Sequence, residues 1–577
     1  MILQSLAAYY ERRGRDPDPA RRLPPFGFAI RPVPIVVEID RAGALGVLRA
    51  TREVQGKKRI AREFLLPIGE KKAGIGAIAN LLWDTAEYAL GRGAKGAAFI
   101  ARVEALAELA PADKGLAALL KFLRALPVAA LERQPLWTET VEDNLVLTYQ
   151  LHEDTQLIAE RPAVVAAIER SASTVDSAMV QCLVTGEQAP LARVHNNIKG
   201  VWGAQTSGAN IVSFNLDAFR SYGKDQGANA PVGEPAAFAY TTALNDLLAR
   251  DSRNRMQVGD ASTVIWAAER DDLATAVVDI FGEPPKDDPG RNVDAARKLL
   301  AAVETGRKGD ADDTFYILGL APNASRIAIR FWIVAPLPEL APRVERWLLD
   351  TRIVHRDYEP EQLSLFRLLL SVALLAKADN IPPNLGGDVV RAVLSGESTP
   401  LPALLLNAAI ERTRARHTDA ERALDHARAA TIKVALNRAI RFRNLSSSDP
   451  EQEFPVSLDP DRSDPAYRLG RLFAALEKIQ EEAQPGINAT IRDRYYGAAS
   501  STPVAVFTTL LRLHKHHLAK LSVARRTWFE KLVGYIMDGL GDFPRQLDLA
   551  DQGRFAIGYY HQRQAFFTKS TDTSTKE

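Results

Sequence analysis

Cysteine and long apolar runs are scarce in this sequence. Its 577 residues include one cysteine, Cys182, which excludes a disulfide framework and any zinc site built from several cysteines. A lone thiol is typical of a reducing cytoplasm. No run of 18 apolar residues occurs, and the opening MILQSLAAYYERRGRD reads as an amphipathic helix without the parts of a signal peptide. We therefore expect a cytoplasmic protein with no membrane partner.

An excess of either sign of charge is also missing. The 73 Lys and Arg residues nearly balance the 71 Asp and Glu residues, for a formal net charge of +2. Basic residues nevertheless cluster at 56–59, 405–445 and 510–531. Such clusters in a neutral chain indicate localised contacts with polyanions, although a solvated face is the commoner explanation for any one of them.

Strand-like and helical patterns divide the chain unevenly. Runs rich in β-branched and aromatic residues, such as FGFAIRPVPIVVEID and STVIWAA, alternate with helices up to about residue 270. After a short mixed stretch at 315–334, the sequence is almost wholly helical. Segments rich in Pro, Gly, Ser and Asp at 282–292 and 446–465 indicate linkers or long loops. The predicted fold is α+β, with a mixed α/β N-terminal region and an all-α C-terminal helical bundle. The predicted parts are an N-terminal region at 1–285, a mixed and helical middle region at 286–450, a helical bundle at 451–567 and a disordered tail at 568–577.

The segment CLVTGEQAPLARVHNNIKGVWGAQTSGAN, at 182–210, joins the lone cysteine to a histidine and a glycine-rich loop. His195 follows Cys182 by thirteen residues, and no oxyanion motif accompanies the pair, so a thiol nucleophile is not indicated. One cysteine and one histidine leave a tetrahedral metal site two ligands short. The loop also lacks the glycine spacing of a phosphate-binding motif. We predict no catalytic residue, no metal and no cofactor.

What remains is a glycine-punctuated loop that displays short polar side chains. Its polar residues are Lys199, Gln205, Thr206 and Ser207, followed by Asn210. Glycine lets a backbone approach a partner closely, and these side chains supply the donors and acceptors that suit the edges of a DNA groove. The alternative that the residues leave open is a tight turn between two core strands.

Several segments, in this order along the chain, resemble one known family. The main ones are EKKAGIGAIANLLWDTAEYALG at 70–91, IKGVWGAQTSGANIVSFN at 198–215, FYILGLAPNASRIAIRFW at 315–332 and the helical stretch beginning AYRLGRLFAALEKIQ at 466–507. They resemble the large subunit of the type I-C CRISPR surveillance complex, Cascade. Because the similarity spans nearly the whole chain, chance is a poor explanation for it.

The resemblance implies a DNA-reading subunit that is not an enzyme. Such a subunit recognises the short motif beside the target, the PAM, helps to open the duplex and supports the displaced strand, while a guide RNA reads the sequence. The implied partners are a complex carrying CRISPR RNA, target double-stranded DNA with its displaced strand, the Cascade backbone and guide-end-capping subunits, and a recruited helicase-nuclease. A small subunit made from the same gene, which the C-terminal bundle resembles, is a further implied partner.

The resemblance also ranks candidate DNA contacts. The first choice for reading or separating PAM base pairs is the glycine-rich loop, with Lys199, Gln205, Ser207 and Asn210. The second choice is the SYGKDQGANAPV segment, with Lys224 and Asn229. Trp202 is expected either to stack on a base or to lie in the core.

Two further sets are candidates for contact with the DNA backbone. Lys71 and Lys72 are expected to meet phosphates of the PAM duplex, and Asn80 either bonds a base edge or, as the better supported interpretation, caps the following helix. A basic face on one C-terminal helix is expected to track a DNA strand by phosphate contacts. Its residues are Arg512, Lys515, Lys520 and Arg526.

The implied small subunit needs a start site inside the gene. Methionine occurs only at positions 1, 179, 256 and 537, none of which precedes the bundle closely. An alternative start codon is therefore expected, and Val456 or Leu458, in the segment before the bundle, is suitably placed.

Two other classes of function remain open. One is a nuclease or phosphodiesterase using His195, His355 or the HKHH cluster at 514–517, although no carboxylate stands at helical spacing beside that cluster. The other is a structural scaffold without direct DNA contact.

Overall fold

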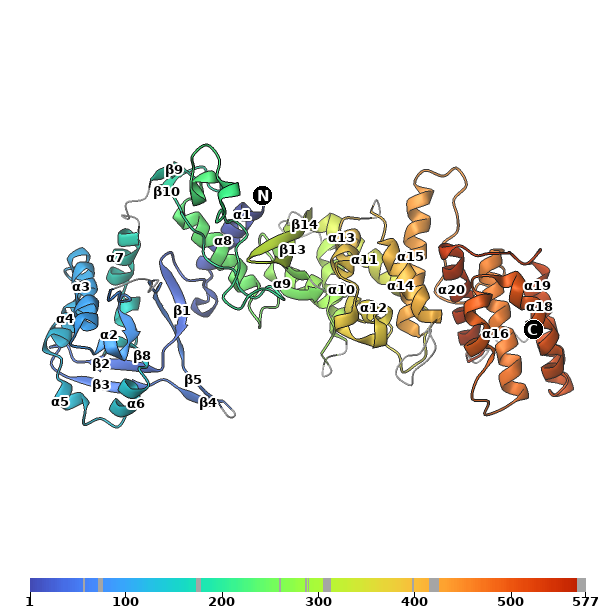
Figure 1. Cartoon of the computed structure of the whole chain (residues 1–577), viewed down its shortest axis with the longest axis horizontal. Coiled ribbons are helices and arrows are strands. Elements are labelled where there is room, and N and C mark those ends of the chain that lie inside the picture. Colours follow the sequence, from blue (N-terminus) through green and yellow to red (C-terminus); the bar gives the residue numbers. More distant parts are fainter. Residues whose placement is uncertain are drawn as a thin grey trace. The chain divides into compact units, whose positions relative to one another are not determined.

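The structure is a computed structural model that describes residues 1–55, 58–70, 76–172, 178–258, 261–285, 288, 290–304, 313–396, 399–414 and 425–567. The chain divides into two compact units (Figure 1). Unit 1 is Met1–Asn197 with Val212–Asp246, and unit 2 is Ile198–Ile211 with Leu247–Glu577. The predicted α+β fold, with a strand-rich N-terminal region and a helical C-terminal region, is confirmed. The finer borders at residues 285 and 450 stay predictions, and the predicted tail lies outside the described residues.

Unit 1 is built around a four-stranded sheet of order β3-β2-β8-β7. Its strands are β2 Ile35–Ile39, β3 Gly46–Ala50, β7 Trp83–Thr85 and β8 Val146–Leu151. β2 runs parallel to β8, and its Ile35, Val36 and Val37 are fully buried, as expected for a strand covered on both faces. Helix α4 packs on both strands, and Phe122 from that helix lies against Tyr149 of β8 with ring centroids 6.3 Å apart.

The remaining elements of unit 1 are helices and three two-stranded sheets. The α-helices are α1 Ile2–Gly14, α2 Ala86–Ala89, α3 Ala94–Leu109, α4 Lys114–Ala125, α5 Val128–Leu131, α6 Trp137–Glu142, α7 Pro162–Ala172 and α8 Glu234–Leu247, whose last residue already belongs to unit 2. The antiparallel strand pairs are β1 Phe28–Pro32 with β6 Glu63–Pro67, β4 Glu53–Gln55 with β5 Lys58–Ile60, and β9 Met179–Gln181 with β10 Gln188–Pro190.

Unit 2 begins with a four-stranded antiparallel sheet of order β11-β12-β13-β14. Its strands are β11 Arg255–Val258, β12 Ala261–Ala267, β13 Thr314–Asn323 and β14 Arg326–Pro336. Every residue of β12 is buried, and α9, α11 and α13 pack against the sheet. A bulge lies between Gly319 and Leu320, where the ring of Phe331 occupies the space that a side chain at Gly319 would need.

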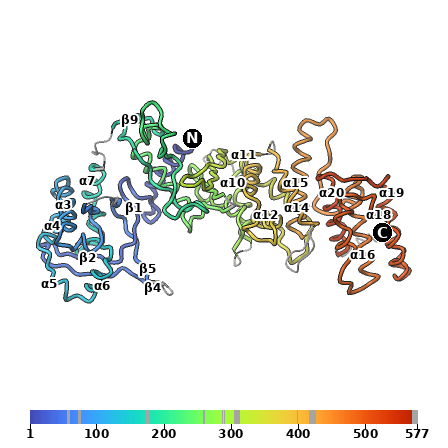
Figure 2. The backbone as a smooth tube through the Cα atoms, in the orientation of Figure 1, coloured from blue at the N-terminus to red at the C-terminus, as the bar shows by residue number. Residues whose placement is uncertain are grey.

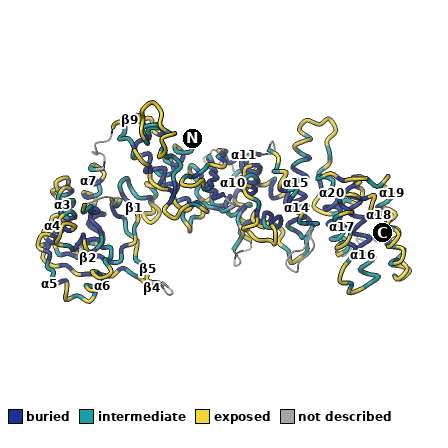
Figure 3. The backbone as a smooth tube through the Cα atoms, in the orientation of Figure 1, coloured by how far each residue is buried: buried dark blue, intermediate teal, exposed yellow. Residues whose placement is uncertain are grey.

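Helices form the rest of unit 2. They are α9 Asp271–Phe281, α10 Arg291–Glu304, α11 Leu337–Thr351, α12 Leu365–Val372, α13 Leu385–Leu394, α14 Ala403–Arg414, α15 His426–Asn444, α16 Pro465–Ala483, α17 Ile491–Ala499, α18 Pro503–Leu518, α19 Val523–Asp538 and α20 Leu549–Ala565. Helix α16 is buried along most of its length, whereas α18 and α19 keep exposed faces (Figure 3). No helix in the described ranges is long and apolar enough to cross a membrane.

The segment at 446–465 before the bundle, called the strap below, is held to the preceding part of unit 2 at Phe454 and Val456, although its composition indicates a linker. Figure 2 follows the chain from α15 through this segment to α16. The Asn437 side chain on α15 accepts from the backbone N of Phe454 (2.7 Å) and donates to its backbone O (2.9 Å). Phe454 is only 2% exposed, and the backbone O of Val456 accepts from Val354 N at 2.7 Å. Because these contacts are not local, the Ser, Asp and Pro content could not indicate them.

Candidate nucleic-acid interface

The glycine-rich loop forms a hairpin anchored on the sheet of unit 2. The backbones of Ile198 and Ala209 exchange two hydrogen bonds of 2.8 and 2.9 Å. The backbone O of Asn210 then accepts a hydrogen bond of 3.0 Å from the start of β14. Gly200 has a φ of +86°, and a Cβ there would lie 2.6 Å from the backbone O of Leu248, so the turn requires glycine. The base of the hairpin is therefore held by the core.

The polar side chains predicted for this loop lie at its surface. Lys199, Gln205 and Ser207 are exposed, and Asn210 is half-buried. Trp202 is 60% exposed, so this tryptophan is not a core residue. The structure thus brings the four first-choice residues together on one anchored hairpin, beside an exposed aromatic ring.

The second-choice segment is organised by Asn229. Its Oδ1 accepts from Ser221 N at 3.0 Å, and its Nδ2 donates to the backbone O atoms of Lys224 (3.1 Å) and Gln226 (2.9 Å). An amide used in this way holds the turn, while the Lys224 side chain is exposed. Asn229 is therefore a structural residue of the turn that displays Lys224.

Asn80 does not cap a helix, contrary to the sequence interpretation. It is 5% exposed, and the chain after it enters β7, because Trp83–Thr85 pairs with β8 as a strand. Its Oδ1 accepts from Glu70 N at 2.9 Å, and its own N donates to Asp84 Oδ2 at 2.8 Å. The Asn80 side chain thus joins the two ends of the 70–80 segment. The predicted phosphate contacts Lys71 and Lys72 lie outside the described residues.

The basic C-terminal cluster spans two helices, so the prediction of one helix is wrong. Ser522 interrupts the helical pattern, and its Oγ accepts from the backbone N of the third residue on, which starts α19. Arg512 and Lys515 lie exposed on α18, Lys520 is exposed in the turn, and Arg526 is half-buried on α19. The basic residues therefore lie around a helical hairpin.

Two histidines of this hairpin, His514 and His517, have lowered pKa values. Burial lowers the pKa of His514 more than the hydrogen bond to the backbone O of Leu511 raises it. Burial and then the positive charge of Lys520 lower the pKa of His517. His514 Nδ1 lies 2.6 Å from a backbone O of its own helix. Within the described ranges, no three His, Cys, Asp or Glu side chains are grouped so as to hold a metal ion.

His195 is a buried residue of unit 1. It is 4% exposed, and its Nδ1 lies 2.6 Å from the hydroxyl of Tyr240. Burial lowers the pKa of His195 to about 4 and raises the pKa of Tyr240 well above its ordinary value. Cys182 is also buried, at 1% exposure, as a small apolar side chain.

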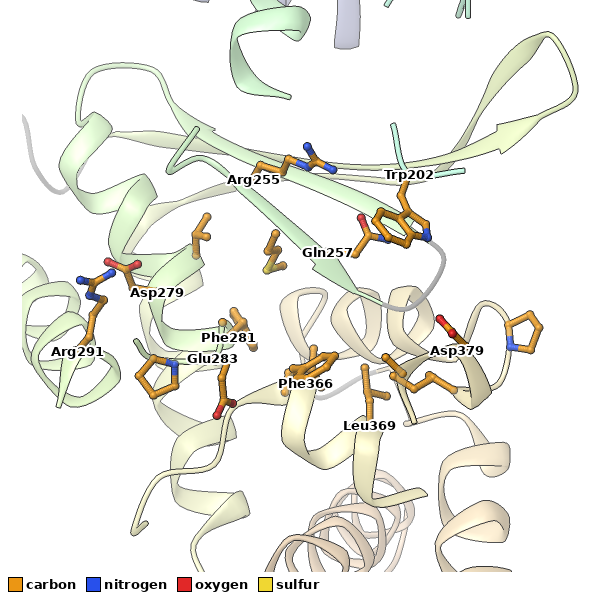
Figure 4. A pocket seen from close by; sticks show the side chains of 18 residues that line it. Trp202, Arg255, Gln257, Asp279, Phe281, Glu283, Arg291, Phe366, Leu369 and Asp379 are labelled. Atoms are coloured by element: carbon orange, nitrogen blue, oxygen red, sulfur yellow. The ribbon is translucent and has the colours of Figure 1, made fainter. Parts of the chain in front are cut away.

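The structure adds a feature that sequence reasoning missed. A cavity of about 690 Å³ in unit 2 is lined by Trp202 together with Arg255, Gln257 and Phe366 (Figure 4). These residues come from the loop, from β11 and from α12, which are far apart in the sequence. The only signal for the site in the sequence is Trp202 itself, in a loop of small polar residues.

Comparison with known proteins identifies the family. A search of curated proteins finds no match. The family model described as CRISPR-associated protein (Cas_Csd1) matches residues 6–567, which is nearly the whole chain and includes the hairpin, the strap and the C-terminal helices. The chain belongs to the Csd1 family of CRISPR-associated proteins.

Proposed function

We propose that this chain is the large, non-catalytic subunit of a type I-C CRISPR surveillance complex and that it recognises the PAM. The observation that carries the proposal is the anchored hairpin at 198–209, which displays Lys199, Gln205 and Ser207 to solvent. Membership of a CRISPR-associated family supports a role in an RNA-guided complex.

The chemistry of the hairpin suits a DNA groove. An ammonium such as that of Lys199 contacts phosphates and positions the protein without reading the bases. The amide of Gln205 donates and accepts at once, so it can bond base edges or fill the space left by a separated base pair. A rigid base holds the hairpin in place, which lowers the entropic cost of binding.

The remaining roles follow from the same proposal. The helical hairpin with exposed Arg512, Lys515 and Lys520 contacts a DNA strand through its phosphates. The guide RNA, the backbone subunits and the guide-end-capping subunit complete the complex, and a recruited helicase-nuclease cuts the DNA.

Duplex binding by the assembled complex tests the proposal. We expect Gln205→Ala to reduce discrimination between PAM variants by about 1–3 kcal/mol, the scale of one base contact. Lys199→Ala should weaken binding to all duplexes alike and reduce its salt dependence. Matched controls are Gln188→Ala and Lys121→Ala, which change exposed residues of the same types in unit 1, outside the hairpin. Unchanged PAM preference and affinity in both hairpin variants would show that the hairpin does not read the PAM.

Charge reversal tests the C-terminal contact in the same assay. Lys515→Glu combined with Lys520→Glu should shorten the lifetime of the opened duplex more than it weakens PAM binding. Equal effects on both steps, or no effect on either, would instead indicate a solvated face.

A further inference from the structure

The cavity beside Trp202 has the size and lining of a ligand site. Its volume of about 690 Å³ falls in the range of pockets that bind small organic groups. Trp202 enters from the glycine-rich hairpin, Gln257 and Arg255 from the edge strand β11, and Phe366 from α12. The apolar part of the lining includes Met256, Phe281, Leu369 and Ile381.

Two aromatic rings lie on opposite sides of the cavity. Figure 4 shows the indole of Trp202 on the side of the sheet and the ring of Phe366 on the side of the helices. Trp202 is 60% exposed and Phe366 is 36% exposed. Exposed large rings that converge on one cavity indicate a ligand that covers them. A flat aromatic group is the ligand that gains most from stacking between such surfaces.

The hydroxyl of Ser262 orients the Gln257 amide next to the indole of Trp202. The backbone N of Trp202 donates to Ser262 Oγ at 2.9 Å, and Ser262 Oγ donates to Gln257 Oε1 at 3.0 Å. The Ser262 hydroxyl thus accepts from Trp202 and gives its one proton to Gln257, whose amide oxygen faces Ser262. The orientation of the Gln257 amide is therefore fixed relative to the hairpin.

The charges around the cavity select against a phosphate inside it. Three carboxylates line it, from Asp279, Glu283 and Asp379. Asp279 already pairs with Arg253 at 3.1 Å, and Glu283 pairs with Arg367 at 2.6 Å. Those two carboxylates are thus partly neutralised. Arg255 and Arg291 also line the cavity, but Arg291 pairs with Asp288 at 3.0 Å, so the lining charges nearly balance and give little attraction for an anion. A neutral ring can enter, while a phosphate attached to it stays outside.

We propose that this cavity takes one unstacked nucleobase from a DNA strand held by the hairpin. The base stacks on Trp202 and Phe366, the amide of Gln257 contacts its edge, and the strand continues past the exposed Lys199. This inference rests on the proposed function, because the hairpin supplies both the PAM contact and Trp202. A base held here would be unable to pair again with its complement, which would favour the open duplex.

Photocrosslinking in the assembled complex tests the inference. The probe is a target duplex in which iododeoxyuridine replaces one thymidine at a time, in and beside the PAM on the displaced strand. We expect one position to crosslink to a peptide containing Trp202 or Phe366. Trp202→Ala and Phe366→Ala should each weaken binding of a single-stranded oligothymidylate by the isolated chain about 5- to 150-fold, the range for one stacked base. Trp202→Phe should keep most of the affinity, which separates lost stacking from misfolding.

The control is Tyr358→Ala, which removes a ring that is 69% exposed in unit 2 and does not line the cavity. Crosslinks that never reach the cavity, or wild-type affinity in both alanine variants, would overturn the inference. If the wild-type complex also shows PAM-dependent duplex binding, the proposed function stands without the base site. A wild-type complex without PAM dependence would instead refute the proposed function. Binding of oligothymidylate by the alanine variants would still show whether the cavity takes a base.

Discussion

At the scale of single residues, burial controls the charge of several side chains inside unit 2. Lys433 on α15 is 2% exposed, and its Nζ donates to the backbone O of Asp350 at 3.1 Å. Burial lowers the pKa of Lys433 to about 8, although the negative charges of Asp350 and Glu453 oppose the shift. His561 on α20 is fully buried, and burial lowers its pKa to about 3. The charged form of either residue therefore destabilises the folded protein.

Replacing Lys433 by methionine will change how stability depends on pH. The pKa of Lys433 is about 8 in the folded protein and 10.5 in the unfolded chain. Between these values the unfolded chain binds more protons, so the free energy of unfolding of the wild type rises with pH. Between pH 8 and pH 10.5, we expect the free energy of unfolding of the wild type to rise relative to that of Lys433→Met. The rise is up to about 3 kcal/mol, at ~1.36 kcal/mol per pKa unit.

Melting temperatures measured from pH 7 to pH 10.5 check this prediction. Lys121→Met, at an exposed position on α4, is the control and should leave the pH dependence unchanged. If the curves of wild type and Lys433→Met run parallel, Lys433 does not lose a proton in the folded protein.

At the scale of elements, two glycines allow α16 and α20 to pack closely. A Cβ at Gly470 would lie 2.0 Å from the backbone O of Phe555, and a Cβ at Gly558 would lie 2.0 Å from the backbone O of Tyr467. Each obstacle is backbone, which cannot rotate away as a flexible side chain can. The contact also brings Tyr467 Oη within 3.0 Å of the Nδ1 atom of buried His561.

Adding one methyl group at this crossing should separate the helices. We expect Gly558→Ala to destabilise the protein by about 1–3 kcal/mol or more, because overpacking outweighs the gain in helix propensity. The matched control is Gly534→Ala on α19, where a Cβ would meet nothing within 4 Å. That variant should be more stable by about 0.5–1 kcal/mol. Denaturant unfolding followed by circular dichroism measures both, and equal effects of the two substitutions would contradict the role of the crossing.

At the scale of the whole molecule, the C-terminal helices contribute to two hydrophobic cores. Phe473 of α16 and Phe507 of α18 belong to a core made within the bundle itself. Ile557 and Tyr560 of α20 instead join the core of the middle helices of unit 2, and Tyr560 donates to the backbone O of Val354 at 2.9 Å. The bundle therefore has a core of its own and a second apolar face that is covered in the full chain.

This arrangement bears on the predicted internal start at Val456. A product beginning there keeps the bundle core but loses Phe454 and the middle helices, so it exposes Ile557 and Tyr560. We expect a product of roughly 13–14 kDa, at about 110 Da per residue, that co-purifies with the complex because another surface covers this face. Intact mass and the N-terminal sequence of that band check the prediction. The prediction fails if the complex contains only the full-length chain and silent recoding of the Val456 codon changes nothing.

The sequence by itself determined the fold class and the main candidate site. β2 and β12 could be recognised because β-branched runs bounded by turn residues are local patterns. The loop with Lys199 and Gln205 could be recognised because glycine and polar residues alternate within a few positions. The scarcity of cysteine and of long apolar runs was likewise visible in composition alone.

Only the tertiary structure decided the properties that depend on contacts distant in sequence. It placed Trp202 at the surface, packed Phe454 against α15 and paired the residues after Asn80 with β8. The cavity lies between several segments that are far apart in the sequence, and Phe454 of the strap is buried, with its backbone N and O both bonded to the Asn437 amide on α15. The local sequence indicates which secondary structure a segment prefers, whereas the burial of that segment depends on which other segments pack against it.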